Sequence, residues 1–410
     1  MLSHLNNTLY IDGVSVEKLA KKYGTPLYIY SKSQLLNNFN GFNDAFAGTR
    51  HLVCFALKSN SNHTLLKLLA EAGAGVDITS GGELYRSLQA GFEPGKIVYA
   101  GIGKTAEEIT YALKTGIMMF NMESIEELEQ INRIAGRMKK KAPVAFRINP
   151  NVDPETHHYI TTGKSGNKFG IPYEQAISAY KYAAKLPNIN VVGIHCHIGS
   201  QITKAKPFEL AAKRMKDIVD KLAHTGIQLK YVDLGGGLGI RYNDETPPSP
   251  RDLRNAVIPV FKDFKGTFVF EPGRYISGNT AILAAKVIYR KISGGKHFLI
   301  VDTGFNDLLR PAFYDAFHEI LPVNSKGGKK IRVDVVGPIC ESSDFMGKGR
   351  MLPNIEQGGY LAAKCAGAYG FAMSSQYNSR VRAAEVLVDG NKATVIRERE
   401  TFRDLIVKEN

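Results

Sequence analysis

Between residues 50 and 275, short apolar runs rich in β-branched residues alternate with longer amphipathic stretches. The amphipathic stretches, such as NHTLLKLLAEAG and SIEELEQINRIAGRMKK, repeat apolar residues at the spacing of one helical face. Each run has the length of one buried strand, so the alternation predicts βα units around a parallel sheet. The runs predicted as strands are Leu52–Leu57, Gly75–Ile78, Ile97–Ala100, Ile117–Asn121, Val144–Ile148, Val191–His197, Tyr231–Leu234 and Thr267–Phe270.

The number of these runs indicates which α/β fold is formed. Eight units over roughly 220–250 residues match the size of a (β/α)8 TIM barrel. An open doubly wound sheet is common at this length and remains the alternative, because one miscounted run would remove the match. We therefore predict a TIM barrel for this part of the chain.

After residue 280 the pattern changes to strands without long helices between them. AILAAKVIYRKI, HFLIVDTG, IRVDVVGP and AAEVLVDGNKATVIRE have strand patterns, and DGNK in the last of them predicts a tight hairpin turn. The N-terminal segment LYIDGVSVEKLAKKYGTPLYIYS has a strand–helix–strand pattern and is expected to pack with this part. We predict a barrel at residues 34–280 and a second, mostly β domain formed by residues 1–33 and 281–410.

The composition is that of an ordinary globular protein. Of 410 residues, 44% are hydrophobic and 22% charged, which argues against a disordered chain or a coiled-coil rod. The chain has no apolar run of transmembrane length and no visible secretory signal, so no membrane partner is expected. Its four cysteines are too few for a disulfide framework and fit a reducing compartment, so we predict a cytoplasmic protein.

The net charge of +14 admits several kinds of anionic partner. The lysines are scattered, and the chain has no arginine-rich helix and no zinc-finger spacing, so we expect no nucleic-acid partner. The charge is compatible with a negatively charged substrate or cofactor, or simply with a soluble surface.

Polar residues follow the predicted strands at the ends where a barrel of this kind carries its active site. They include Lys58, Arg147, Asn149, His195, His197, Ser200, Gly235–Gly237 and Glu271–Arg274. Because so many titratable types converge on one rim, we interpret this rim as a site rather than a packing layer.

Lys58 ends the first run, in CFALKSN. Partial desolvation there would lower the pKa of the lysine and leave more of the nucleophilic amine, which is the chemistry of a Schiff-base lysine. The alternative is a surface lysine whose stem covers apolar neighbours.

The loop DLGGGLG follows a predicted strand and is expected to precede a helix. Its successive glycines let backbone N–H groups turn toward an anion such as phosphate, although a simple tight turn explains them equally well. Ile240 stands where a dinucleotide fingerprint requires glycine, so that motif is rejected. In EPGR, Arg274 can bind an anion bidentately, which leaves Glu271 for a cationic ring nitrogen; a salt bridge between them is the alternative.

His195 and His197 point to the same side of a strand. Metal binding is conceivable, but no third ligand with suitable spacing is evident, so we predict no metal. One histidine is expected to stack on a ring or form a hydrogen bond. For the other, the alternative interpretation is a histidine buried in the core with its hydrogen bonds satisfied.

Several of these motifs together resemble a known family. CFALKSN, TSGGEL, HCHIGSQ, DLGGGLG and EPGR resemble the pyridoxal-phosphate decarboxylases of the alanine-racemase-like fold, which pair a (β/α)8 barrel with a β domain. RINPNVDPETHHYITTGKSGNKFGI, GFNDLLRPAFYDAFH, GPICESSD and AGAYGF are similar to the diaminopimelate decarboxylase family. The resemblance implies decarboxylation of meso-2,6-diaminopimelate to L-lysine and CO₂, the last step of lysine biosynthesis. It also implies the cofactor pyridoxal 5′-phosphate and a homodimer with shared active sites.

The resemblance also implies roles for particular residues. Lys58 matches the Schiff-base lysine, His197 the histidine stacked on the cofactor ring, and Glu271 the carboxylate at the pyridine nitrogen. Cys340 matches the proton donor, supplied by the second subunit, and its place in a polar loop argues against a buried free cysteine. The implied cofactor-binding residues are Lys58, His197, Ser200, Gly235, Gly236, Gly237, Glu271, Pro272, Gly273, Arg274 and Tyr369. The implied substrate-binding residues are Arg274, Arg310, Tyr314, Glu341 (reading the distal ammonium) and Tyr369.

Rival functions remain within the same fold. Ornithine, arginine or carboxynorspermidine decarboxylases share the barrel motifs but are not expected to carry NDLLRPAFYDAFH. A non-catalytic cofactor carrier has no use for Cys340, Glu341 or Tyr369. A racemase would need a tyrosine opposite Lys58, and CESSD fits decarboxylation better.

Overall fold

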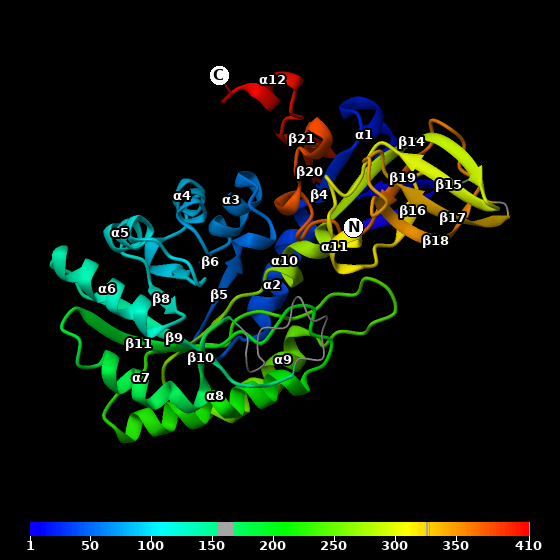
Figure 1. Ribbon diagram of the computed structural model, residues 1–410. Helices are drawn as coiled ribbons and strands as arrows, with labels where there is room; N and C mark the ends of the chain where they lie inside the picture. Colours follow the sequence, from blue (N-terminus) through cyan, green and yellow to red (C-terminus); the bar gives the residue numbers. More distant parts are fainter. Residues whose placement is uncertain (154–167, 325–326, 328, 410) are drawn as a thin grey trace. The chain divides into compact units, whose positions relative to one another are not determined.

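The computed structural model describes residues 1–153, 168–324, 327 and 329–409, and the chain divides into two compact units (Figure 1). We call them the barrel unit and the β unit. The barrel unit consists of Phe39–Ile240 and Thr246–Tyr275. The β unit consists of Met1–Asn38, Arg241–Glu245 and Ile276–Asn410.

The strands of the barrel unit form a closed ring of parallel pairs. Their order is β5-β6-β7-β8-β9-β11-β12-β13, and β13 pairs with β5 to close the ring. The prediction of a TIM barrel is therefore confirmed, and the open-sheet alternative is wrong. The ring strands are β5 (His51–Ala56), β6 (Gly75–Ile78), β7 (Ile97–Tyr99), β8 (Met119–Met122), β9 (Ala142–Asn149), β11 (Ile189–His195), β12 (Tyr231–Asp233) and β13 (Thr267–Phe270). The short β10 (Ile171–Pro172) pairs with β9 outside the ring.

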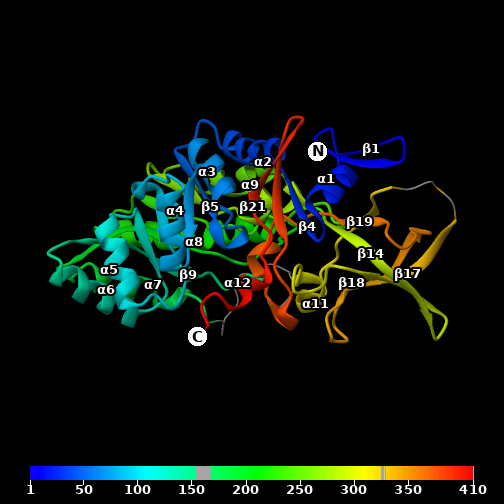
Figure 2. The same ribbon diagram turned by 90° about the horizontal axis from the view of Figure 1, so that it is seen from above.

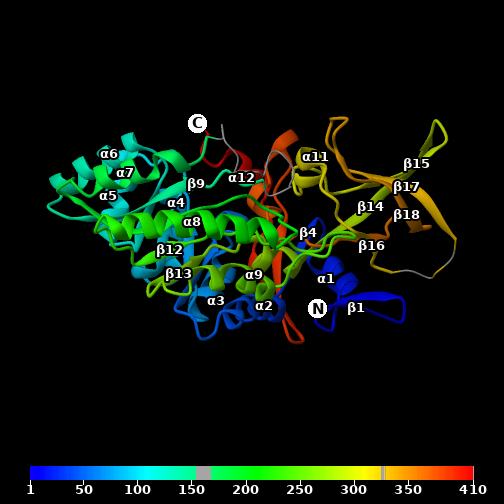
Figure 3. The ribbon, with the colours of Figure 1, turned by 90° about the horizontal axis from the view of Figure 1, so that it is seen from below.

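The helices of the barrel unit lie outside this ring (Figures 1 and 3). Several begin at a side chain that accepts a backbone N–H: Thr105 and Glu108 form a capping box, and Gly116 ends the same helix in the left-handed region. The helices are α3 (His63–Glu71), α4 (Gly81–Gln89), α5 (Ala106–Thr115), α6 (Ile125–Arg137), α7 (Ala176–Ala183), α8 (Lys206–His224) and α9 (Pro250–Val257). Two more helices, α2 (Lys32–Ala45) and α10 (Arg274–Ser277), each include residues of both units.

The glycine loop after β12 departs from expectation, because no helix follows it directly. Residues 234–249 form no helix, and α9 begins only at Pro250, capped by Ser249. The sequence PPSP accounts for the delay, since a residue before proline is disfavoured in helical conformation. The side chain of Gln201 holds this loop through bonds to the backbone O and N of Ile240, at 2.6 and 3.1 Å.

The β unit is built on a sheet whose main path runs β18-β17-β15-β14-β4-β20-β21 (Figure 2). β4 pairs with both β14 and β20, so the N-terminal segment is part of this unit, as expected from its pattern. The strands of the β unit are β1 (Leu2–Leu5), β2 (Thr8–Ile11), β3 (Val14–Ser15), β4 (Leu27–Ser31), β14 (Ala281–Ser293), β15 (Lys296–Val301), β16 (Ile320–Pro322), β17 (Lys330–Val336), β18 (Phe345–Pro353), β19 (Tyr360–Ala363), β20 (Ala384–Asp389) and β21 (Lys392–Arg397). Its helices are α1 (Val16–Tyr23), α11 (Arg310–Tyr314) and α12 (Phe402–Ile406).

Two local features of the β unit test the sequence pattern. The DGNK hairpin is confirmed, because Asp389 pairs with Lys392 and Gly390 has a φ of 57°. β18 was not anticipated, since its sequence FMGKGRMLP contains two glycines and no β-branched residue. It is held as a strand by its antiparallel pairing with β17.

No helix in the described parts of the chain is both long and apolar enough to cross a membrane.

Asp307, in the β unit, is a buried acid that should make folding stability depend on pH. Its side chain accepts a hydrogen bond from the Thr303 hydroxyl at 3.0 Å, and burial raises its pKa to about 7. The unfolded chain releases this proton near its ordinary pKa, so stability falls as pH rises from about 4 to about 7. We expect Asp307→Asn to remove this fall, so its free energy of unfolding relative to wild type should rise by roughly 1–3 kcal/mol between pH 4 and pH 8. Urea denaturation at both pH values measures it.

The control is Asp44→Asn, which changes an exposed aspartate and should show the same relative stability at both pH values. If Asp307→Asn also showed no difference between the two pH values, Asp307 would not carry the proton in the folded state.

Candidate active site at the carboxyl ends of the barrel strands

Lys58 lies in a short 3-10 turn directly after β5, beside a buried carboxylate. Its Nζ is 2.7 Å from Oδ2 of Asp77 on the neighbouring strand β6. Asp77 is fully buried, whereas the Lys58 side chain is 39% exposed, so the amine is reachable from solvent. Burial and the charge of Glu271 raise the pKa of Asp77 to about 7, against the opposing effect of Lys58. The sequence analysis missed Asp77, although a lone carboxylate inside the apolar run GVDI was a visible signal.

The glycine loop lies beside His197. Gly235 and Gly237 have φ values of 65° and 112°, which favour glycine. The N–H of Gly236 donates to Nδ1 of His197 at 3.1 Å, so this nitrogen is an acceptor and the ring is neutral. Burial and the nearby charge of Arg147 lower the pKa of His197 well below its usual value. The N–H of Gly235 also donates within the protein, to Oδ1 of Asp233 at 2.9 Å, so two loop N–H groups are not directed at an anion.

Arg274 and Ser200 meet on the same rim. The Arg274 guanidinium, which is 6% exposed, donates to the Ser200 hydroxyl at 3.2 Å. Gly273, just before it, lies so close to Ser59 and Ala56 that a Cβ at position 273 would be 3.0 Å from theirs. The structure therefore places Pro272 and Gly273 against the turn that carries Lys58, and the backbone N–H of Ala56 donates to the Pro272 oxygen at 3.4 Å.

A buried cluster surrounds Glu271, at the end of β13. Its carboxylate lies 3.3 Å from His195 Nε2, and the Asn121 amide donates both to Glu271 at 3.2 Å and to Asp233 at 3.1 Å. Although burial opposes ionisation, His195 and Lys58 hold the pKa of Glu271 below its usual value. Burial and Glu271 together raise the pKa of Asp233 well above its usual value.

The same cluster bears on the question of a metal. Sequence analysis found no third ligand for His195, whereas the structure places ligand atoms of His195, Asp233 and Glu271 within 4.8 Å of one another. Asp233 and Glu271 come from the next two strands of the ring, and their proximity depends on register that the sequence does not display. The Asn121 amide points its N–H groups at both carboxylates, where a cation would need to bind, which favours a hydrogen-bonded cluster.

Arg147 is part of a separate ion pair on the rim. It contacts Glu123 at 3.0 Å, and both side chains are buried. Glu123 also accepts the backbone N–H of Gly170 at 2.6 Å. Of the motif that begins at Arg147, residues 154–167 lie outside the described residues.

The remaining predicted residues belong to the β unit. Arg310 begins α11 and is buried; its guanidinium lies 2.8 Å from His318 Nε2 and 4.4 Å above the Tyr242 ring. Tyr314 ends the same helix and is partly buried, with its ring edge-on to Phe313.

Cys340 and Glu341 lie together on an exposed loop of the β unit. The Cys340 thiol is free and its residue exposed, so the alternative of a buried cysteine is wrong. Its backbone N–H donates to the Asn378 side chain at 2.9 Å. Glu341 accepts a hydrogen bond from the Tyr377 hydroxyl. Tyr369 is partly buried and has a φ of 55°, in the left-handed region.

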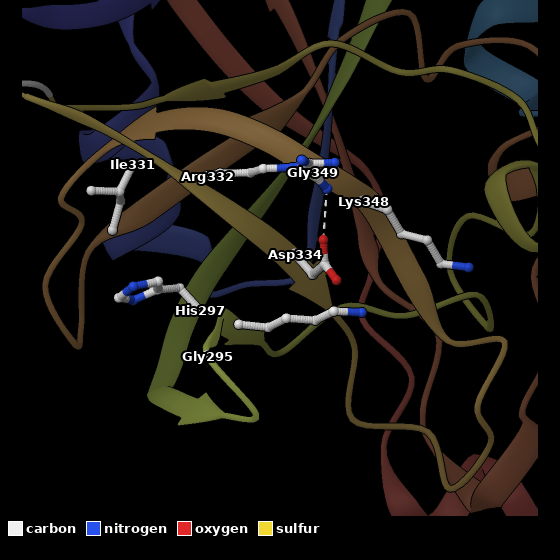
Figure 4. A pocket seen from close by; sticks show the side chains of 8 residues that line it. Gly295, His297, Ile331, Arg332, Asp334, Lys348 and Gly349 are labelled. Atoms are coloured by element: carbon white, nitrogen blue, oxygen red, sulfur yellow. Dashed lines mark hydrogen bonds between the residues drawn. The ribbon is translucent and has the colours of Figure 1, made fainter.

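The β unit also has a surface hollow of about 580 Å³ that none of the predicted site residues lines (Figure 4). The side chain of Asp334 accepts the backbone N–H of Gly349 at 2.6 Å within it. Its lining residues come from neighbouring parts of one sheet: Gly295, Lys296, His297, Ile331, Arg332, Asp334, Lys348 and Gly349.

The close packing of the glycine loop allows a prediction at Gly236. A Cβ there would lie 2.2 Å from the Glu271 carbonyl oxygen, and the bond from the Glu271 N–H to the Gly235 oxygen at 2.8 Å prevents an easy shift. We expect Gly236→Ala to lower the free energy of unfolding by about 1–3 kcal/mol. We also expect it to weaken binding of pyridoxal 5′-phosphate, the cofactor that the sequence resemblance implies, at least about tenfold. Urea denaturation and equilibrium dialysis measure the two effects.

Gly103→Ala is the matched control, because a Cβ there meets nothing within 4 Å. Wild-type stability and binding in Gly236→Ala would mean that the loop is looser than the structure shows.

Comparisons with known proteins cover both units. The chain matches the pyridoxal binding domain of the pyridoxal-dependent decarboxylases over residues 32–278. It is 48% identical over 408 residues to a diaminopimelate decarboxylase of Aquifex aeolicus, covering 99% of this chain and 96% of the relative. A Haemophilus influenzae diaminopimelate decarboxylase is 48% identical over 402 residues, covering 98% and 97% of the two chains. A solved structure of diaminopimelate decarboxylase from M. jannaschii in co-complex with L-lysine matches with a TM-score of 0.96 and 40% identity, covering 100% of this chain and 98% of that one.

Proposed function

The chain belongs to the family of diaminopimelate decarboxylases, and on this premise we propose that it converts meso-2,6-diaminopimelate to L-lysine and CO₂. It is a pyridoxal-phosphate-dependent carboxy-lyase. The observation that carries the proposal is the position of Lys58, a reachable amine on the same barrel rim as a glycine loop, a buried guanidinium and a buried carboxylate.

The residues of the barrel rim fit pyridoxal 5′-phosphate. The cofactor offers a phosphate, a ring nitrogen that is basic, and an aldehyde, and the rim offers Arg274 with the glycine loop, Glu271 and Lys58 for these three groups. When bound, the cofactor supplies an electron sink for the charge left on the substrate carbon after loss of CO₂. The low pKa of Glu271 keeps a negative charge available to a protonated ring nitrogen.

We assign the following roles to residues of this chain. Lys58 would hold the cofactor through its amine and would give way to the substrate amine. Ser200, Gly235 to Gly237, Pro272 and Gly273 surround the phosphate together with Arg274. The His197 ring, neutral because its Nδ1 accepts the Gly236 N–H, is suited to stack on the cofactor ring. Tyr369 is proposed to contribute near both phosphate and substrate.

Recognition of the substrate's distal end is assigned to residues of the β unit, with Arg274. Arg310 and Tyr314 are proposed to bind the distal carboxylate, and Glu341 the distal ammonium. Cys340 is proposed to protonate the substrate carbon. The exposure of Cys340 and Glu341 supports their use at a site completed by a second copy of the chain. We therefore propose a cytoplasmic homodimer in which the barrel, residues 34–280, binds the cofactor, while residues 1–33 and 281–410 supply substrate and dimer contacts.

A product assay tests the function. Purified protein with pyridoxal 5′-phosphate receives meso-diaminopimelate, ornithine, arginine or lysine separately, and mass spectrometry identifies the products. We expect L-lysine from meso-diaminopimelate and no comparable turnover of the other three. Turnover of ornithine or arginine instead would overturn the assignments of Arg310, Tyr314 and Glu341. Cofactor binding without any turnover would favour a carrier.

A further inference from the structure

The side chain of Asp233 connects two parts of the cofactor site that are separate in the sequence. Asp233 is the last residue of β12 and is fully buried. Its Oδ1 accepts the backbone N–H of Gly235 at 2.9 Å, and its Oδ2 accepts the Asn121 amide at 3.1 Å. Its carboxyl also lies within 4.8 Å of that of Glu271, and the Asn121 amide donates to both. One carboxyl group thus lies next to both the glycine loop and the carboxylate assigned to the cofactor ring.

These contacts form a closed ring of hydrogen bonds that passes through Asn121. The Asp233 side chain accepts the Gly235 N–H, the Gly235 carbonyl accepts the backbone N–H of Glu271 at 2.8 Å, and the Asn121 amide donates to the side chains of both Glu271 and Asp233. A closed ring of this kind couples the positions of its residues. Neither the glycine loop nor the Glu271 carboxylate can shift without breaking a buried bond.

The charge balance of the pair favours one proton between the two carboxyls. Two buried carboxylates in contact cannot both ionise readily, and the group with better cationic partners ionises first. Glu271 has His195 at 3.3 Å, while Asp233 accepts from two neutral donors, the Gly235 N–H and the Asn121 amide. Burial and Glu271 raise the pKa of Asp233 well above its usual value, so Asp233 holds the proton of the pair.

We propose that Asp233 is a positioning residue that holds the Gly235–Gly237 loop and the Glu271 carboxylate at a fixed separation. The inference rests on the proposed cofactor site. The phosphate and the ring nitrogen of pyridoxal 5′-phosphate are joined by a stiff ring, so the groups that receive them need a matching, preorganised separation. Asp233 touches neither end of the cofactor and acts only through Gly235 and Glu271.

Substitutions at Asp233 separate its two contacts. Asp233→Ala removes both. Asp233→Asn keeps an acceptor for the Gly235 N–H and a donor for Glu271, and loses only the acceptor for Asn121. Asp233→Ser keeps a short polar group next to Gly235 but does not reach Glu271. A lost buried hydrogen bond costs about 1–3 kcal/mol. We therefore expect binding of a ring-bearing cofactor analogue to weaken about 10- to 100-fold in Asp233→Ala, and no more than about tenfold in Asp233→Asn.

The probes are 4′-deoxypyridoxine 5′-phosphate, which lacks the aldehyde and so bypasses Lys58, and inorganic phosphate alone. Dissociation constants are measured by fluorescence titration for the first probe and by ³¹P NMR for the second. Asp233→Ala should weaken both probes, whereas Glu271→Gln should weaken only the ring-bearing probe. Asp307→Ala, which removes a buried carboxyl of the β unit, is the control and should change neither.

Each outcome decides the inference. Unchanged binding of both probes in Asp233→Ala overturns it. If Asp233→Asn and Asp233→Ala weaken probe binding equally, an ionised carboxylate is needed instead. If Asp233→Ala does not fold, Asn and Ser are compared, and equal affinities for the ring-bearing probe in these two overturn the link to Glu271. Failure of the wild-type protein to bind the ring-bearing probe would overturn the proposed cofactor site and this inference together. Tight binding of the probe by the wild-type protein, with unchanged affinity in Asp233→Ala, would overturn only the inference.

Discussion

Lys58→Ala is expected to abolish decarboxylation, with kcat falling by at least about 10⁴-fold. The variant loses the amine that we propose holds the cofactor and gives way to the substrate amine. The structure places Nζ on a side chain that solvent and ligands can reach, with the carboxylate of Asp77 at 2.7 Å to orient it. The visible absorbance band of the lysine-bound cofactor should disappear, while phosphate binding on the glycine loop should persist.

The measurement is a spectrum of the protein mixed with pyridoxal 5′-phosphate, followed by borohydride reduction and peptide mass spectrometry. In the wild-type protein the cofactor mass should be found on the peptide that contains Lys58. Lys67→Ala on α3 is the matched control, because that lysine is 62% exposed and its ion pair in the described part of the chain is with Glu71 on its own helix. Survival of the band in Lys58→Ala would show that another lysine holds the cofactor.

Cys340→Ala should lower kcat by about 10²- to 10⁴-fold, the usual contribution of a positioned proton donor. Cofactor binding should be unchanged, because Cys340 lies in the β unit and no cofactor contact is assigned to it. Cys365→Ala is the control: it also removes a free thiol of the β unit, but one that is buried, with Sγ 3.7 Å from the Arg241 oxygen. Steady-state kinetics with meso-diaminopimelate distinguishes the two variants.

A mixing experiment extends this result to the shared active site. If Cys340 acts on the barrel of the partner subunit, mixing the Lys58→Ala and Cys340→Ala proteins should restore activity. Random exchange of subunits gives mixed dimers with one intact site of two, so about a quarter of wild-type activity is expected. No recovery, with subunit exchange demonstrated by mass spectrometry, would show that each chain completes its own site.

The barrel could be predicted because its strands are short apolar runs bounded by polar turns. All eight predicted runs correspond to strands of the ring, although most boundaries differ by one or two residues. The hairpin at Gly390 was predictable for a local reason, since Asp-Gly favours the backbone of a two-residue turn. In these cases the information lies within a few adjacent residues.

The residues that sequence analysis missed share a different property. Asp77, Asn121 and Asp233 are single polar residues in apolar strands, and each gains its role from residues of other strands of the ring. Asn121 bridges Asp233 and Glu271, which lie 112 and 150 residues away in the chain. Contacts of this kind follow from the register of the closed ring, which no local pattern encodes. For the same reason the grouping of His195 with two carboxylates could not be foreseen.

The position of β4 in the β sheet has a consequence for synthesis of the chain. β4, whose five residues are all buried, is paired with β14 and β20. About 250 residues separate β4 from β14, which at 5–20 residues per second represents roughly 12–50 s of translation. Throughout that time the apolar strand LYIYS has left the ribosome without its partners, while all the strands of the barrel emerge. Completion of this sheet is therefore a late, largely post-translational event, and the nascent chain presents an unpaired strand that a chaperone can bind.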